Sequence, residues 1–137
     1  MAPYDECIIY LLAKAYQKAH GHFKKRLQAH GLTPIQHLIV EALWLEEGVP
    51  AGELGKRLTL DSATLSGVLD RMADNGWVVK NQDLEDKRIT RVFLSERARD
   101  LHPVLAGERR AANEEILAAL TQEERILLRR LLKDVQG

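Results

Sequence analysis

Hydroxyl and cationic side chains gather in two stretches of this 137-residue chain, at residues 62–71 and 87–91. Short hydroxyl side chains let a protein backbone approach DNA closely, and they can donate to phosphates and reach base edges. Lysine and arginine bind the sugar-phosphate backbone, and an arginine at a hairpin tip can enter a narrow minor groove. These two stretches therefore predict DNA contacts by Ser62, Thr64, Ser66, Arg71, Lys87, Arg88 and Arg91.

Acidic residues lie beside the second group of cations. A carboxylate at Asp86 can hold the guanidinium of Arg88, two residues later, in a fixed geometry. The sequence predicts no role for Asp83 or Glu85 beyond keeping the loop solvated. The whole chain carries 20 Lys and Arg against 20 Asp and Glu, so a surface for nucleic acid must come from local placement rather than from net charge.

Apolar spacing and capping signals predict the elements that would position these side chains. Thr33 with Gln36 and Thr121 with Glu124 form capping-box patterns, and Asp61 is a good N-cap. A change to β-branched and aromatic residues after Gly76 indicates a hairpin. We expect helices over residues 4–29, 33–46, 51–58, 61–75, 95–120 and from 121 onward, with strands at 77–80 and 89–94.

The order helix, tight turn, helix and hairpin predicts a mainly α fold with a small β-hairpin wing, the winged helix-turn-helix plan. In that plan the second helix of the pair enters the major groove of DNA, which here is the helix over residues 61–75. This helix must bury one face and present polar groups on the other. Its expected buried residues are Ala63, Leu65, Val68, Leu69 and Met72.

Several short motifs, in this order, resemble the MarR family of bacterial transcription regulators. The most specific match is the wing, Asp86-Lys87-Arg88 followed by Leu94-Ser95. Supporting matches are Leu32-Thr33-Pro34 with Gln36, Glu53-Leu54, Leu69 with Arg71-Met72, and Asn75-Gly76-Trp77-Val78.

The resemblance implies a single domain over residues 1–137. Its winged-helix DNA-binding part would span about 33–95, and the N- and C-terminal helices, 1–30 and 96–137, would form a dimerisation region. The implied homodimer interface includes Ile8, Leu12, Ile116, Leu117, Leu120, Leu128 and Leu131. Such proteins bind pseudo-palindromic double-stranded operators and usually repress transcription, and a small phenolic ligand, an oxidant such as a peroxide, or a metal commonly releases them. By analogy Arg88 contacts the minor groove and Asp86 supports it.

Two features leave alternatives open. Cys7 could be a redox sensor, since residues 60–65 are similar to a peroxide-sensing branch of the family; alignment on Thr33 and Gln36, however, places that branch's cysteine at Ile9. A free cysteine is more often a small buried hydrophobic residue. A ligand pocket is the second feature, with core packing as the alternative role of its residues, Tyr10, Tyr16, Phe23, His37 and Trp44.

The remaining patterns narrow the function classes. A lone cysteine excludes an intrachain disulfide, and no apolar run resembles a signal peptide or a membrane span, so we expect a cytoplasmic protein. Neither metal-ligand spacing nor a cofactor-binding or catalytic motif is present, so we expect no metal site, no cofactor and no enzyme activity. The main alternative to a DNA-binding repressor is a winged-helix protein-interaction module that does not bind DNA.

Overall fold

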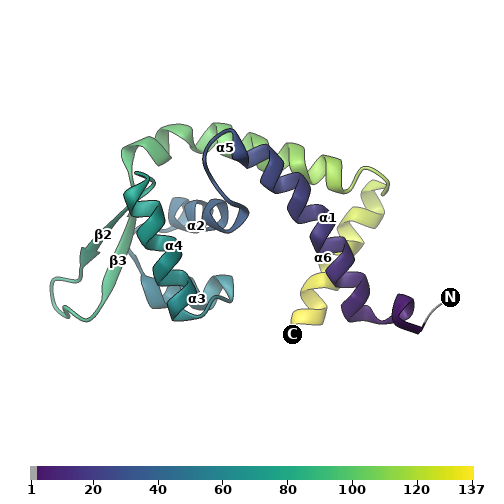
Figure 1. Ribbon diagram of the computed structural model, residues 1–137, viewed down its shortest axis with the longest axis horizontal. Helices are drawn as coiled ribbons and strands as arrows, with labels where there is room; N and C mark the ends of the chain where they lie inside the picture. Colours follow the sequence, from purple (N-terminus) through teal and green to yellow (C-terminus); the bar gives the residue numbers. More distant parts are fainter. Residues whose placement is uncertain (1–2) are drawn as a thin grey trace. The chain divides into compact units, whose positions relative to one another are not determined.

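Helices form most of the computed structural model, which describes residues 3–137 (Figure 1). A 3₁₀ turn, η1, precedes the first α-helix. Segments that lie between helices in the sequence form a small three-stranded sheet. In chain order the elements are η1 (Pro3–Glu6), α1 (Ile8–Gln28), α2 (Pro34–Leu45), β1 (Val49–Pro50), α3 (Ala51–Leu58), α4 (Ser62–Asp74), β2 (Val78–Gln82), β3 (Thr90–Leu94), α5 (Glu96–Ile116) and α6 (Gln122–Gln136).

Side-chain caps begin three of these helices. At α2, Gln36 N donates to Thr33 Oγ1 at 3.3 Å and Thr33 N donates to Gln36 Oε1 at 3.0 Å. The same reciprocal pair joins Thr121 and Glu124 at the start of α6. Asp61 caps α4 by accepting from Thr64 N at 2.8 Å. Each cap satisfies backbone N–H groups that the first turn of a helix leaves unpaired, and the predicted capping boxes are confirmed.

The sheet has three antiparallel strands in the order β1-β3-β2. Strands β2 and β3 form the predicted hairpin, with Val78 opposite Leu94 and Gln82 opposite Thr90. The sequence did not predict β1, which pairs with the other edge of β3 through Val49 opposite Val92. The wing is therefore anchored on one side to the segment between α2 and α3.

The chain forms two compact units, and the first is built from residues 27–106. It contains the winged-helix elements and the beginning of α5. Its buried hydrophobic core is Leu27, Leu32, Ile39, Val40, Leu43, Val49, Leu54, Leu65, Val68, Leu69, Met72, Trp77, Val78, Val92, Leu94, Ala98, Leu105 and Ala106. Burial of this mainly aliphatic set is the main force that holds α4 against α3 and the sheet.

The second unit comprises residues 3–26 and 107–137. Arg26 of α1 donates through Nε to Glu115 of α5 at 2.9 Å, which ties two of its helices together. Many of its large apolar side chains remain exposed, namely Tyr4, Ile8, Ile9, Leu11, Leu12, Tyr16, Ile126, Leu127, Leu131, Leu132 and Val135. An exposed apolar surface of this extent on a helical unit is typical of a protein–protein interface.

The structure corrects three expectations about the helices. The first turn is 3₁₀ rather than α, so Cys7 lies between η1 and α1. Helix α5 ends at Ile116 rather than near residue 120, because Arg125 Nε donates at 3.2 Å to the carbonyls of both Leu117 and Leu120 and so stabilises a turn. Ala63, expected on the buried face of α4, is exposed in its first turn. Within residues 3–137, no helix has the length and apolar character needed to cross a membrane.

Candidate nucleic-acid interface

Helix α4 is packed so that one face is buried and the other is open. Leu65, Val68, Leu69 and Met72 are buried, as the spacing predicted. The tight turn before α4 is closed by Thr59, which adopts the left-handed conformation with φ 56°, and by Leu60 N, which donates to Gly55 O at 2.9 Å. These contacts fix the direction in which α4 leaves the turn.

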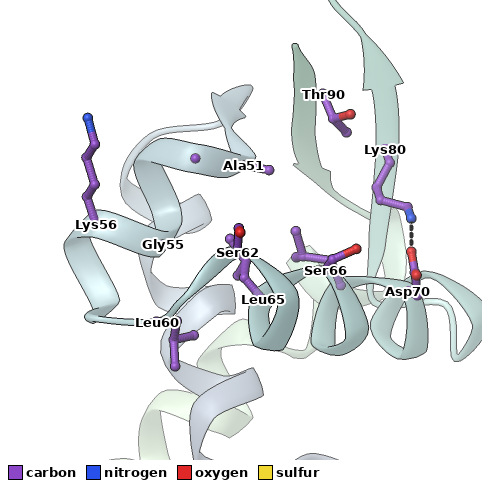
Figure 2. A pocket seen from close by; sticks show the side chains of 12 residues that line it. Ala51, Gly55, Lys56, Leu60, Ser62, Leu65, Ser66, Asp70, Lys80 and Thr90 are labelled. Atoms are coloured by element: carbon purple, nitrogen blue, oxygen red, sulfur yellow. Dashed lines mark hydrogen bonds and ion pairs between the residues drawn. The ribbon is translucent and has the colours of Figure 1, made fainter. Parts of the chain in front are cut away.

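A cleft of about 270 Å³ lies between α3, α4 and the hairpin. Figure 2 shows Ser62 and Ser66 on the side of α4 that faces this cleft, with Leu65 at its base. Its full lining is Ala51, Gly52, Gly55, Lys56, Leu60, Ser62, Leu65, Ser66, Leu69, Asp70, Lys80 and Thr90. The structure thus brings two of the three predicted hydroxyls, Ser62 and Ser66, to one open surface.

Two lysines at this cleft were not among the predicted contacts. Lys56 extends from α3, and Lys80 reaches from β2 to an ion pair with Asp70 of α4 (Figure 2). Their positions depend on how α3 and β2 pack beside α4, so no local sequence signal identifies them. Phosphate oxygens are the natural partners of such cations.

Thr64 occupies a different position from the two serines. Its Oγ1 donates to Asp61 Oδ2 at 2.9 Å, and its backbone N donates to Asp61 Oδ1. These hydrogen bonds, the backbone bond first, hold the pKa of Asp61 below its usual range. Thr64 therefore completes the N-cap of α4. Arg71 is exposed further along this helix.

The wing loop holds the predicted arginine and its carboxylate together. Arg88 donates to Asp86 through Nε and Nη2, both at 3.0 Å, and its backbone N also donates to Asp86 at 3.1 Å. The hydrogen bonds from Arg88 lower the pKa of Asp86 and raise that of Arg88, so both stay charged. The Arg88 side chain is nevertheless 90% exposed, which leaves its outer edge open to a ligand.

Arg91 differs from Arg88 because its guanidinium has two partners inside the unit. Nε donates to Asp83 Oδ1 at 2.6 Å, and Nη1 donates to the Gly48 carbonyl at 2.9 Å. Asp83, for which the sequence predicted no role, is therefore part of the wing structure. An aspartate at the start of a loop commonly accepts hydrogen bonds from backbone N–H groups two and three residues later. This tendency could have predicted the structural role of Asp83 from the sequence. Lys87 is exposed beside Arg88.

The residues proposed for a ligand pocket have separate surroundings. His37 is fully buried, with Nε2 at 3.6 Å from Glu41 Oε1. Trp44 stacks on His102, with ring centroids 3.9 Å apart. In the other unit, the rings of Tyr10 and Tyr16 pack against Tyr4 and His20, and Phe23 is half-buried. None of these residues lines the cleft beside α4.

The last two candidate features are the thiol of Cys7 and a metal site. Cys7 is exposed rather than buried. Across residues 3–137, no group of three or more His, Cys, Asp or Glu side chains is placed to hold a metal ion.

Comparison with known proteins agrees with this geometry. The MarR family profile matches residues 32–90. The regulator TtmR of Methylorubrum extorquens is 38% identical over 93 residues, which is 68% of this chain and 46% of TtmR, so the chain spans less than half of that relative's length. A probable transcriptional regulator from Pseudomonas aeruginosa superposes with a TM-score of 0.91 at 30% identity, over 96% of this chain and 98% of that one. Bordetella bronchiseptica BpsR has the same fold, with a TM-score of 0.92 at 23% identity over 100% and 98% of the two chains. The chain belongs to the MarR family of transcriptional regulators.

Proposed function

We propose that this DNA-binding regulator is a homodimeric repressor that reads a pseudo-palindromic operator with α4 and the wing and is released by a small molecule or an oxidant. The observation that carries the proposal is the open face of α4, where Ser62 and Ser66 border a cleft between α4, α3 and the hairpin. Small hydroxyls on the exposed face of a rigidly held helix suit close approach to base edges in the major groove.

The surrounding charges support binding to a phosphate backbone. Three of the acidic residues in this region are engaged by the protein itself, because Asp70 pairs with Lys80, Asp83 with Arg91 and Asp86 with Arg88. Within the described part of the chain, Lys56, Arg71 and Lys87 make no ion pair. A surface with little net charge by residue count can therefore offer cations to DNA phosphates.

The wing supplies the second contact. Arg88 is exposed, and Asp86 holds its guanidinium from one edge, so the other edge can enter a narrow minor groove beside the major groove that α4 would occupy. Lys87 would bind a neighbouring phosphate. Arg91 is a weaker candidate for direct contact, since Asp83 and Gly48 already accept from its guanidinium.

Dimerisation would use the unit built from the two ends of the chain. Ile8 and Leu12 of α1 and Leu131 of α6 are exposed there, and they belong to the interface that the family resemblance implies. MarR regulators act as dimers, and two copies would present two α4 helices to half-sites about one helical turn apart.

Effector release rests on analogy with relatives and on Cys7. DNA binding by BpsR is regulated by 6-hydroxynicotinic acid. A monocyclic aromatic acid or phenol is therefore the first effector class to test. The exposed thiol of Cys7 makes a hydroperoxide the second.

Fluorescence anisotropy tests the proposal with labelled DNA from the region upstream of the protein's own gene and excess random DNA as competitor. Wild type, Arg88→Ala and a control, Arg99→Ala, would be titrated at several salt concentrations. Arg99 carries the same charge but pairs with Glu47, and it neither lines the cleft nor belongs to the wing loop. Because Arg88 would read the minor groove rather than bind a phosphate, Arg88→Ala should weaken binding to the specific DNA by about 1–3 kcal/mol for each wing, whereas Arg99→Ala should leave the affinity unchanged.

The same assay tests release. A hydroxybenzoate or cumene hydroperoxide should lower the anisotropy of the complex, and Cys7→Ser should abolish only the peroxide response. Wild-type binding that random DNA displaces as readily as specific DNA would contradict the repressor proposal. Specific binding that neither compound releases would contradict the effector classes alone.

A further inference from the structure

A continuous chain of hydrogen bonds runs from the body of the winged-helix unit to the wing loop. It begins at Gly48, whose N donates to Val92 O at 2.9 Å, so β3 fixes its position. The Gly48 carbonyl accepts from Arg91 Nη1 at 2.9 Å, and Arg91 Nε donates to Asp83 Oδ1 at 2.6 Å. Arg91 therefore links the turn before β1 to the first residue of the wing loop.

Asp83 connects this chain of hydrogen bonds to the tip of the wing loop. Its second carboxylate oxygen, Oδ2, accepts from the backbone N of Glu85 at 3.1 Å and of Asp86 at 2.9 Å. Ile89 N donates to Asp86 O at 3.0 Å, and Asp83 N donates to Ile89 O at 2.9 Å. The backbone of Asp86 is thus held by Asp83 from one side and by Ile89 from the other.

Asp86 in turn sets the position of Arg88. Its carboxylate accepts from Arg88 Nε and Nη2, both at 3.0 Å, which fixes the plane of the guanidinium. A long, exposed arginine held in one geometry loses less conformational entropy when it binds a ligand than a freely rotating one. The hydrogen bond from Arg91 lowers the pKa of Asp83, which keeps Asp83 ionised and able to accept on both oxygens.

We infer that Asp83 is a positioning residue for DNA binding, acting through Asp86 on Arg88, and that Arg91 anchors Asp83 to Gly48 instead of contacting DNA. This inference rests on the proposed contact between Arg88 and DNA. It assigns a role to an acidic residue that simple electrostatics would count as unfavourable on a DNA-binding surface.

A neighbouring anion provides a matched control. Glu85 lies two residues from Asp83 in the same loop, and its carboxylate makes no hydrogen bond or ion pair with any residue among 3–137. If only charge matters, Asp83→Ala and Glu85→Ala should both strengthen binding to the DNA polyanion. If Asp83 is a positioning residue, the two substitutions should affect DNA affinity differently. Asp83→Ala should weaken DNA binding, and Glu85→Ala should leave it equal or stronger.

A double-mutant cycle on the dimer of the 137-residue chain measures the coupling. DNA affinity is determined for wild type, Asp83→Ala, Arg88→Ala and the double variant, each checked for folding by circular dichroism and for dimer formation by gel filtration. Asp83→Ala should weaken binding by roughly two- to a hundredfold, the range seen for directly coupled neighbours. In the Arg88→Ala background the same change should have no further effect.

A second variant keeps the test decisive if Asp83→Ala unfolds the wing. Arg91→Lys keeps the charge but cannot donate to Asp83 and Gly48 in the same planar geometry. The anchor role predicts weaker DNA binding, and a direct phosphate contact predicts binding close to wild type.

Four results would overturn the inference. They are stronger binding by Asp83→Ala, an equal loss with and without Arg88, wild-type affinity in Arg91→Lys, and wild-type affinity in Arg88→Ala. The last would also remove the proposed wing contact. Failure of the wild type to bind any specific DNA would be a failure of the repressor proposal itself, and the wild-type titration shows it before any variant is compared.

Discussion

Gly55 lies where α3 approaches the turn that leads into α4. A Cβ at this position would lie 3.1 Å from the Leu60 carbonyl oxygen and 3.4 Å from Leu65 Cδ2. The Leu60 oxygen belongs to the backbone of the turn rather than to a flexible side chain, and the hydrogen bond from Leu60 N to Gly55 O holds this turn close to α3. Gly55→Ala should therefore push α3 and the turn apart.

The magnitude follows from two opposing contributions. Extra volume in a packed contact costs about 1–3 kcal/mol, whereas alanine is favoured over glycine in a helix by about 0.5–1 kcal/mol. Gly52 lies in the same helix, and a Cβ there meets no atom within 4 Å. Gly52→Ala should therefore gain the helix preference of alanine without the cost of extra volume. Since that contribution is common to both variants, their free energies of unfolding should differ by about 1–3 kcal/mol.

Urea unfolding followed by circular dichroism measures this difference. All proteins must be compared at one protomer concentration, because dimerisation couples stability to concentration. Gly55→Ala should unfold at a lower urea concentration than wild type, and Gly52→Ala at an equal or higher one. Equal midpoints for the two variants would refute the close approach of α3 to the turn.

Three further predictions concern other parts of the chain. His102→Ala removes both the ring nitrogen 3.1 Å from the half-buried Glu41 carboxylate and the ring stacked on Trp44, and it should lower the free energy of unfolding by about 1–3 kcal/mol, measured by the same urea assay; an unchanged midpoint would show that neither contact stabilises the unit. Hydrogen bonds from Arg88 lower the pKa of Asp86. Their contribution to the free energy of unfolding is therefore complete above the pKa range of an ordinary aspartate and is lost as the pH falls through the lowered pKa. The NMR resonance of the Arg88 Nε–H should shift in that acid range, and Asp86→Asn should remove the shift. Leu131→Glu places a charge on the exposed apolar face of α6 and should give monomers in sedimentation velocity, whereas unchanged dimers would exclude Leu131 from the interface.

Local signals were sufficient for most helix boundaries. Thr33, Asp61 and Thr121 are N-caps as predicted, since a cap depends only on side chains within three residues. Strand β1 was missed because two residues, Val49 and Pro50, carry no periodicity and become a strand only by pairing with β3. The end of α5 was also missed, since it depends on contacts across a turn.

In the candidate site too, contacts between residues close in sequence could be predicted, and contacts between distant residues could not. The link between Asp86 and Arg88 could be predicted because the two residues lie two positions apart. The contact of Arg91 with Gly48 could not, because it joins residues 43 apart in sequence. That contact makes Arg91 a weaker candidate for DNA binding than its charge alone suggested. The Lys80 position at the cleft depends in the same way on the packing of β2 beside α4.

The most direct test of DNA reading by α4 and the wing is selection of bound sequences from a random double-stranded DNA library, because selection works without a known operator. We expect the wild-type dimer to enrich an inverted repeat whose half-sites lie about one helical turn apart. Ser62→Ala with Ser66→Ala should relax the preference within each half-site, while Arg88→Ala should relax it only at the flanking positions. Recovery of a library no different from the input would contradict sequence-specific binding by α4 and the wing.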